Sequence, residues 1–194
     1  MSGWTVAEVR RALADAEACR LELPGYGRAA VLVPVLDAPE GVSLLFTVRS
    51  AGLARHAGQI AFPGGRLEPG EDVVAAALRE AYEEVGLTVD PADVFGLLDD
   101  RVSPFGLVAT PVVARVAWPA PLLLDHGEVA EAFTVPLALL ADAPVLRETR
   151  LHEGATRVLH RYQVVGRDVW GLTGNVVKDL LDRLARLGGP TAAC

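Results

Sequence analysis

Cysteine is scarce in this chain of 194 residues: only Cys19 and Cys194 occur, near opposite ends. Two cysteines cannot form a disulfide framework, and no CxxC pair or Cys/His cluster offers a zinc site. Uninterrupted apolar runs are also missing, because Arg115 and three prolines break the longest one, 107–124. No signal peptide is visible near the N-terminus. These absences favour a cytoplasmic protein without a membrane-spanning segment.

Basic residues are the minority charge, since 18 Lys and Arg stand against 25 Asp and Glu and the net charge is −7. An acidic chain of this kind is a poor partner for nucleic acid or for an anionic membrane. Intrinsic disorder is excluded as well, because 51% of the residues are hydrophobic and only 22% are charged. The length fits one large domain, with or without extensions.

The pattern of apolar residues predicts an α/β fold in which a mixed sheet lies between helices. Thr5 and Glu8 form a capping-box pattern, and the helix that they start is expected to run to about Glu22. Asp72 can cap a second helix, and Gly86 can end it. The expected strands are 29–36, 42–49, 60–62, 94–98, 107–116, 131–133 and 160–170. The expected later helices are 72–85, 136–140 and 176–184.

The second predicted helix carries an unusual crowd of acids. At about 100° per residue, Glu80, Glu83 and Glu84 share one face within a single turn. Like charges at this spacing are unfavourable unless a cation lies among them, and Mg²⁺ prefers carboxylate oxygens. On this pattern alone, the face is either a metal platform or a solvated acidic surface that Arg79 balances.

The loop before this helix favours the metal platform. Gly64 and Gly65 allow close approach of the backbone, so the loop can aim a carbonyl at a metal that Glu71 also reaches. From Gly65 through Leu87, the chain matches the Nudix box, Gx5Ex7REUxEExGU with U an aliphatic residue, at every fixed position. The chain therefore resembles the Nudix hydrolases.

This resemblance implies a Nudix-type α/β/α sandwich with a mixed, mostly antiparallel sheet and a loop-helix-loop catalytic motif. It implies magnesium or manganese as cofactor, and hydrolysis of a nucleoside diphosphate linked to another group. The catalytic residues that it implies are Glu80, Glu83, Glu84 and Arg79, the last of which orients a glutamate through a salt bridge. The metal ligands that it implies are Glu80, Glu83, Glu84, Glu71 and Gly65.

The charge of the substrate indicates how such a site works. A diphosphate is polyanionic and water is a poor nucleophile at neutral pH. Metal ions assist because they neutralise phosphate oxygens and lower the pKa of bound water. A carboxylate then accepts the proton of the attacking water. We expect Glu80 to be this base, with Glu128 and Glu131 as alternatives.

The segment before the box is basic. Residues 41–67 contain no Asp or Glu, but they carry Arg49, Arg55 and Arg66, with His56 beside Arg55. Guanidinium groups suit a phosphorylated substrate that is bridged to metal ions. The alternative is a chance arrangement in a mostly apolar hairpin.

Segment 45–65 also resembles the motif upstream of the box in coenzyme A pyrophosphatases, LLTxR(S/A)x3Rx3Gx3FPGG. The chain departs from it at Phe46, and at Ala54, where the family has an arginine and Arg55 is the neighbour. The substrate-binding residues that this resemblance implies are Arg49, Ser50, Arg55, His56, Gly58 and Phe62.

Weaker similarities to the same subfamily follow at 105–113, 128–137 and 169–173. The resemblance predicts one Nudix domain over 1–194, with a helical extension at 1–25, a core at 30–187 and a tail at 188–194. The expected activity is metal-dependent hydrolysis of coenzyme A or a derivative to 4′-phosphopantetheine, or its acyl form, and adenosine 3′,5′-bisphosphate. The alternatives are a Nudix hydrolase for ADP-ribose, a dinucleotide or a nucleoside triphosphate, and a non-catalytic domain that senses a nucleotide metabolite.

Overall fold

The computed structural model describes residues 3–14, 17–39, 41–52, 58–152 and 155–188. Among these residues, the main sheet has eight strands: β1 (Gly27–Ala38), β2 (Gly41–Arg49), β3 (Ile60–Ala61), β4 (Gly64–Arg66), β5 (Val94–Leu97), β6 (Arg101–Ser103), β7 (Leu107–Ala117) and β8 (Val129–Pro136). Five of them are neighbours in the order β3-β2-β1-β7-β5. The other three each pair with one of these strands: β4 with β1, β6 with β7, and β8 with β2. β1 and β7 are parallel and the other pairs are antiparallel, so the predicted mixed sheet is confirmed.

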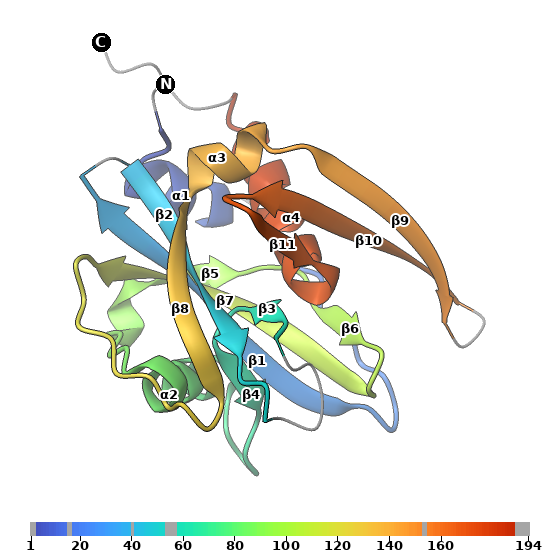
Figure 1. The fold of residues 1–194 in the computed structure, drawn as a ribbon. Coiled ribbons are helices and arrows are strands. Elements are labelled where there is room, and N and C mark those ends of the chain that lie inside the picture. Colours follow the sequence, from blue (N-terminus) through green and yellow to red (C-terminus); the bar gives the residue numbers. More distant parts are fainter. Residues whose placement is uncertain (1–2, 15–16, 40, 53–57, 153–154, 189–194) are drawn as a thin grey trace.

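Helices cover both faces of this sheet (Figure 1). They are α1 (Val6–Ala14), α2 (Val73–Val85), the 3-10 helix η1 (Pro91–Asp93), α3 (Leu137–Asp142) and α4 (Gly171–Ala185). Side chains alternate along β1, so Leu32 and Leu36 pack against α2, whereas Val33 and Val35 face the core beneath α1 and α4. The predicted α/β/α sandwich is therefore confirmed. Among the described helices, none is long and apolar enough to cross a bilayer.

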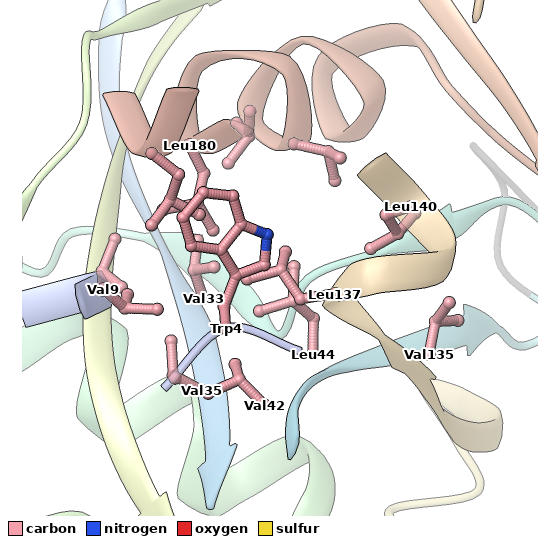
Figure 2. Packing of buried hydrophobic residues seen from close by; sticks show 14 of the residues in the cluster. Trp4, Val9, Val33, Val35, Val42, Leu44, Val135, Leu137, Leu140 and Leu180 are labelled. Atoms are coloured by element: carbon pink, nitrogen blue, oxygen red, sulfur yellow. The ribbon is translucent and has the colours of Figure 1, made fainter. Parts of the chain in front are cut away.

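The N-terminal helix joins the core through Trp4. The predicted capping box is present: the Thr5 N–H donates to Glu8 Oε2 at 2.8 Å, and the Glu8 N–H donates to Thr5 Oγ1 at 3.2 Å. Figure 2 shows the Trp4 indole within the buried cluster that also contains Val9 and Leu180, and only 5% of Trp4 is exposed. The predicted start of the first helix is thus confirmed.

The predicted continuation of this helix to about Glu22 is wrong, because α1 ends at Ala14 and residues 17–23 are not helical. The Cys19 N–H donates to Asp99 Oδ1 and the Leu21 N–H donates to Asp100 Oδ2, both at 2.9 Å. Backbone groups that a longer helix would use are therefore bonded to a loop far along the chain, and these bonds override local helix propensity.

The predicted strand at 160–170 is two strands. Within the described residues, β9 (Val145–His152), β10 (Ala155–Val164) and β11 (Arg167–Trp170) form a second, antiparallel sheet of three strands. The chain reverses at Val165 and Gly166, whose φ angles are +48° and +73°. A two-residue hairpin turn of type I′ requires this left-handed backbone at both positions, but a branched valine rarely adopts it, so Val165 does not signal a turn. β4, β6 and β9 were not predicted either.

A buried carboxylate fastens the N-terminal segment to the main sheet. The Asp100 side chain is inaccessible to solvent. Its Oδ1 accepts hydrogen bonds from Arg20 Nη1 and Thr110 Oγ1, both at 2.7 Å. Its Oδ2 accepts from the Leu21 N–H at 2.9 Å and from Arg28 Nη1 at 3.1 Å. Asp100 is therefore fully satisfied, and four groups depend on it.

We expect Asp100→Ala to lower the free energy of unfolding by about 3 kcal/mol, because it leaves two arginines and buried donors without their acceptor. Urea denaturation measures the loss. The matched control is Asp37→Ala, which breaks an exposed ion pair with Arg115 and should cost less than about 1 kcal/mol. Equal losses in the two variants would contradict a structural role for Asp100.

Candidate active site

Helix α2 carries the predicted carboxylates, and its ends lie where they were predicted. The Asp72 carboxylate accepts hydrogen bonds from the N–H groups of Val74 and Ala75, at 2.8 and 3.0 Å. Gly86 has a φ of +73°, and its N–H donates to the Tyr82 carbonyl. A well-capped helix of defined length fixes which of its side chains face the loop that precedes it.

Arg79 lies at the centre of the carboxylate cluster. Its Nε and Nη2 donate to the two oxygens of Glu71, both at 2.9 Å. Its Nη1 donates to Glu80 Oε1 at 2.9 Å and to Glu83 Oε2 at 3.0 Å. Nη2 also donates to the Arg66 carbonyl at 3.1 Å. A single guanidinium thus gathers three of the predicted carboxylates and joins the loop to the helix.

Glu84 lies on the buried side of this cluster and is 3% exposed. Its Oε2 accepts a hydrogen bond from the Gly64 N–H at 3.3 Å, and Arg49 Nη1 lies 3.7 Å from its Oε1. Arg49 ends β2 and Gly64 begins β4. The ends of two strands therefore meet the acidic helix at this one carboxylate.

Two glycines make this close approach possible. A Cβ atom at Gly65 would overlap the carboxylate of Glu80, and a Cβ atom at Gly64 would overlap the backbone of β1 at Ala30 and Val31. Gly64 admits no side chain, because its neighbours are backbone atoms, whereas a side chain at Gly65 would displace the Glu80 carboxylate. The loop backbone therefore lies directly between β1 and the carboxylates, as the two glycines of the sequence predicted.

The environment of Glu84 disfavours its charge. Burial raises the pKa of Glu84 to about 7, against the opposing effects of the Arg49 guanidinium and the Gly64 N–H. The negative charges of Glu128 and Glu80 raise it further. A buried carboxylate near like charges is a group that a cation would stabilise.

The other carboxylates differ from one another. Burial raises the pKa of Glu80, although the hydrogen bond from Arg79 works against this, and the charge of Glu83 adds to it. Hydrogen bonds from Arg79 and from the Glu68 N–H instead hold the pKa of Glu71 at about 2. Glu71 therefore stays charged and fixes Arg79, whereas burial disfavours the charge of Glu80 even though the same arginine donates to it.

The donor chemistry of this cluster fits a hard divalent cation, which takes carboxylate and carbonyl oxygens. Glu80 lies against the backbone at Gly65 and Glu84 accepts from the Gly64 N–H, so both carboxylates lie at the same stretch of backbone. In the part of the chain that the structure describes, no three Asp, Glu, His or Cys side chains form a ready set of ligands. The guanidinium of Arg79 lies among the other carboxylates instead.

Backbone bonds place two further predicted residues beside this cluster. The Gly58 N–H donates to the Arg49 carbonyl at 2.9 Å, and the Ser50 N–H donates to the Glu128 carbonyl at 2.8 Å. Glu128, one alternative base, is thereby held near Glu84. Glu131, the other alternative, is bound by Arg167, whose Nη2 and Nη1 donate to its oxygens at 2.6 and 3.1 Å.

Phe62, another predicted substrate residue, lies away from this cluster. Phe62 is 3% exposed and stacks on Phe46 with 4.8 Å between ring centroids, so its ring belongs to the core. Arg55 and His56 lie outside the described residues. Two backbone partners were not predicted, the Gly64 N–H at Glu84 and the Arg66 carbonyl at Arg79, because main-chain groups have no side-chain signature.

Comparison with known proteins gives a consistent result. The profile of the NUDIX domain matches residues 26–161. A protein of Cronobacter sakazakii named an uncharacterized Nudix hydrolase, NudL, is 38% identical over 157 residues, which is 79% of this chain and 80% of that protein. Its namesake in Yersinia pestis is 34% identical over 160 residues, with 81% and 80% covered.

Solved structures agree at the level of the fold. A MutT protein from Methanosarcina mazei superposes with a TM-score of 0.56 at 20% identity, covering 87% of this chain and 99% of that one. A MutT/nudix family protein from Enterococcus faecalis gives 0.55 at 16% identity, with 90% and 66% covered. These likenesses concern the arrangement of helices and strands alone.

We expect the stability of the metal-free protein to depend on pH through Glu84. Its pKa is about 7 in the folded chain against an ordinary value of 4.5. The folded state thus keeps a proton that the unfolded chain releases, and stability falls as pH rises from 4.5 to 7. Glu84→Gln removes this dependence, so in chelator at pH 8 it should exceed the wild type by up to about 3 kcal/mol.

Urea denaturation between pH 4 and 8, in the presence of a chelator, measures this difference. The difference in the free energy of unfolding should vanish below pH 4.5, where the wild-type Glu84 carboxyl is protonated in both the folded and the unfolded state. Glu22→Gln, at an exposed position, is the control and should follow the wild type throughout. A constant offset between Glu84→Gln and the wild type at every pH would contradict the raised pKa.

Proposed function

Because this chain belongs to the Nudix hydrolase family, whose members hydrolyse phosphoric anhydrides, we propose that it is a divalent-metal-dependent pyrophosphatase for coenzyme A and its derivatives. The reaction cleaves the anhydride bond of the diphosphate. The oxygen of water joins one phosphorus, and the other phosphate leaves. The products are 4′-phosphopantetheine, or its acyl form, and adenosine 3′,5′-bisphosphate.

One observation carries this proposal: the Arg49 guanidinium lies 3.7 Å from the Glu84 carboxylate. Arg49 belongs to segment 45–65, which resembles the motif of coenzyme A pyrophosphatases, and Glu84 belongs to the Nudix box. Arg49 Nε is buried and has no hydrogen-bond partner among the described residues. A donor of this kind beside the acidic cluster suits a phosphate oxygen of the substrate.

Each residue of the site has its own role in the proposed reaction. Glu80, Glu84 and the backbone of Gly65 are the groups to hold magnesium or manganese, which when bound neutralises phosphate charge and lowers the pKa of water. Arg79 keeps the carboxylates in place through its bonds to Glu71, Glu80 and Glu83. Glu80 accepts the proton of the attacking water. Glu128 is the alternative base that the Ser50 bond supports.

A product screen tests the substrate. The purified protein is incubated with manganese or magnesium and with coenzyme A, ADP-ribose, NADH or diadenosine polyphosphates, and the products are separated by chromatography. We expect the highest kcat/KM for coenzyme A or one of its thioesters. A clear preference for another compound would make the chain a different Nudix hydrolase, and binding without turnover would make it a sensor.

We expect Glu80→Gln and Glu84→Gln each to lower kcat by about 100-fold or more, because each loses a carboxylate that the reaction uses. Circular dichroism should show both variants folded. Glu22→Gln serves again as the control with the same chemical change at an exposed position. Wild-type turnover in either site variant at low metal concentration would contradict these roles.

Arg49→Ala should raise KM for coenzyme A by about 10- to 100-fold, the scale of a lost hydrogen bond to a charged group. Because Arg49 lies beside Glu84, we expect it to bind one of the two phosphates of the substrate's diphosphate. The loss should therefore be the same for dephospho-coenzyme A. A smaller loss for dephospho-coenzyme A would instead assign Arg49 to the 3′-phosphate.

A further inference from the structure

The second sheet ends in an open edge at β9. β9 lies at one side of the three-stranded sheet, and in the described part of the chain it pairs with β10 alone. Figure 1 shows β9 along the outer side of the molecule. Its eight residues pair with β10 in one continuous register, and none of them is proline or glycine. The bulges and prolines that commonly protect edge strands are therefore absent from β9.

More than half of the exposed large apolar side chains belong to this part of the chain, and three of them lie on β9. Of the nine large hydrophobic residues that are exposed in the described chain, five belong to α3, to the second sheet or to its β10–β11 turn: Leu139, Val145, Leu146, Leu151 and Val165. Three of these are on β9 itself, and Leu151 is 76% exposed. A regular edge with apolar side chains is a template for pairing with another strand.

The charges along β9 determine which strand it suits. Opposite residues of an antiparallel pair lie on the same face of the sheet. Two copies of β9 can therefore pair about a twofold axis only if the axis passes midway between one residue and its equivalent in the second copy. An axis at Arg147, Glu148 or Arg150 sets two like charges directly opposite each other. An axis at Thr149 sets no like charges opposite each other and brings Glu148 opposite Arg150 twice.

We propose that β9 is the contact surface between two copies of this chain, which pair antiparallel about Thr149 and extend the two small sheets into one. Each Glu148 then lies opposite Arg150 of the second copy. The aliphatic part of each Arg147 covers Leu151 of the second copy, on the same face as Thr149. Glu148 already accepts from Arg150 and Arg161 within its own chain, and the second copy extends this network across the axis.

Light scattering and sedimentation velocity on the full chain test the first consequence. We expect a particle of twice the 20.5 kDa of one chain at tens of micromolar. A monomer at 100 micromolar would overturn the proposal. The measurement needs no substrate, so it stands apart from the proposed enzymatic function.

Charge reversal tests the surface. Glu148→Arg changes both symmetric pairs into like charges, and so does Arg150→Glu, so each should weaken dimerisation at least tenfold. The double variant Glu148→Arg/Arg150→Glu restores opposite charges and should dimerise again. Glu17→Arg, with the same change of charge at an exposed position far from β9 in sequence, is the control. Single variants that dimerise like the wild type would overturn the role of β9.

Cysteine cross-linking tests the register, in a Cys19→Ser/Cys194→Ser background. Paired residues on the axis have Cα atoms about 4.5–5.5 Å apart, which suits a disulfide. Thr149→Cys should therefore form a covalent dimer on mild oxidation. Leu151→Cys, whose two copies would lie about 13 Å apart, should not. Equal cross-linking of both variants, or of neither, would overturn the proposed axis.

Discussion

The close packing of α2 against β1 is the constraint on which the candidate site depends. Three fully buried alanines, Ala76, Ala77 and Ala81, let the helix lie close to the strand. The backbone between β1 and the helix then has room for glycine alone at Gly64, and a Cβ atom at Gly65 would overlap the Glu80 carboxylate. A larger side chain at Gly64 would push this backbone away from β1, and one at Gly65 would displace the Glu80 carboxylate from its position.

This packing has an electrostatic consequence. Carboxylates that would be hydrated on an exposed helix are partly or fully removed from water, and Glu84 is 3% exposed. Burial disfavours their charge, and the chain offsets this with Arg79 on one side and Arg49 on the other. The two arginines differ in their partners. Arg79 is held by Glu71, which remains charged, whereas the Arg49 contact is longer and leaves a donor available.

The two sheets of the molecule have different chemistry at their surfaces. The main sheet is covered by helices on both faces, and the ends of its strands at Arg49 and Gly64 bring polar groups together beside α2. The second sheet packs Tyr162 and Val169 into the core, while β9 exposes leucines and charges at an open edge. The first arrangement is typical of a small-molecule site, and the second is typical of a surface that pairs with another chain.

Local information in the sequence was sufficient for α2, because its cap, its apolar stripe and its terminal glycine all lie within fifteen residues. The same holds for the spacing of the box residues, and so for which carboxylates share a face. The sequence by itself could not determine where α1 ends, because Asp99 and Asp100 lie about 80 positions away and outweigh a propensity of tenths of a kcal/mol per residue. Nor could it determine that Phe62 is buried or that Glu84 meets Arg49 and the Gly64 N–H. Burial and hydrogen-bond partners depend on which segments fold together, and only the tertiary structure decided that.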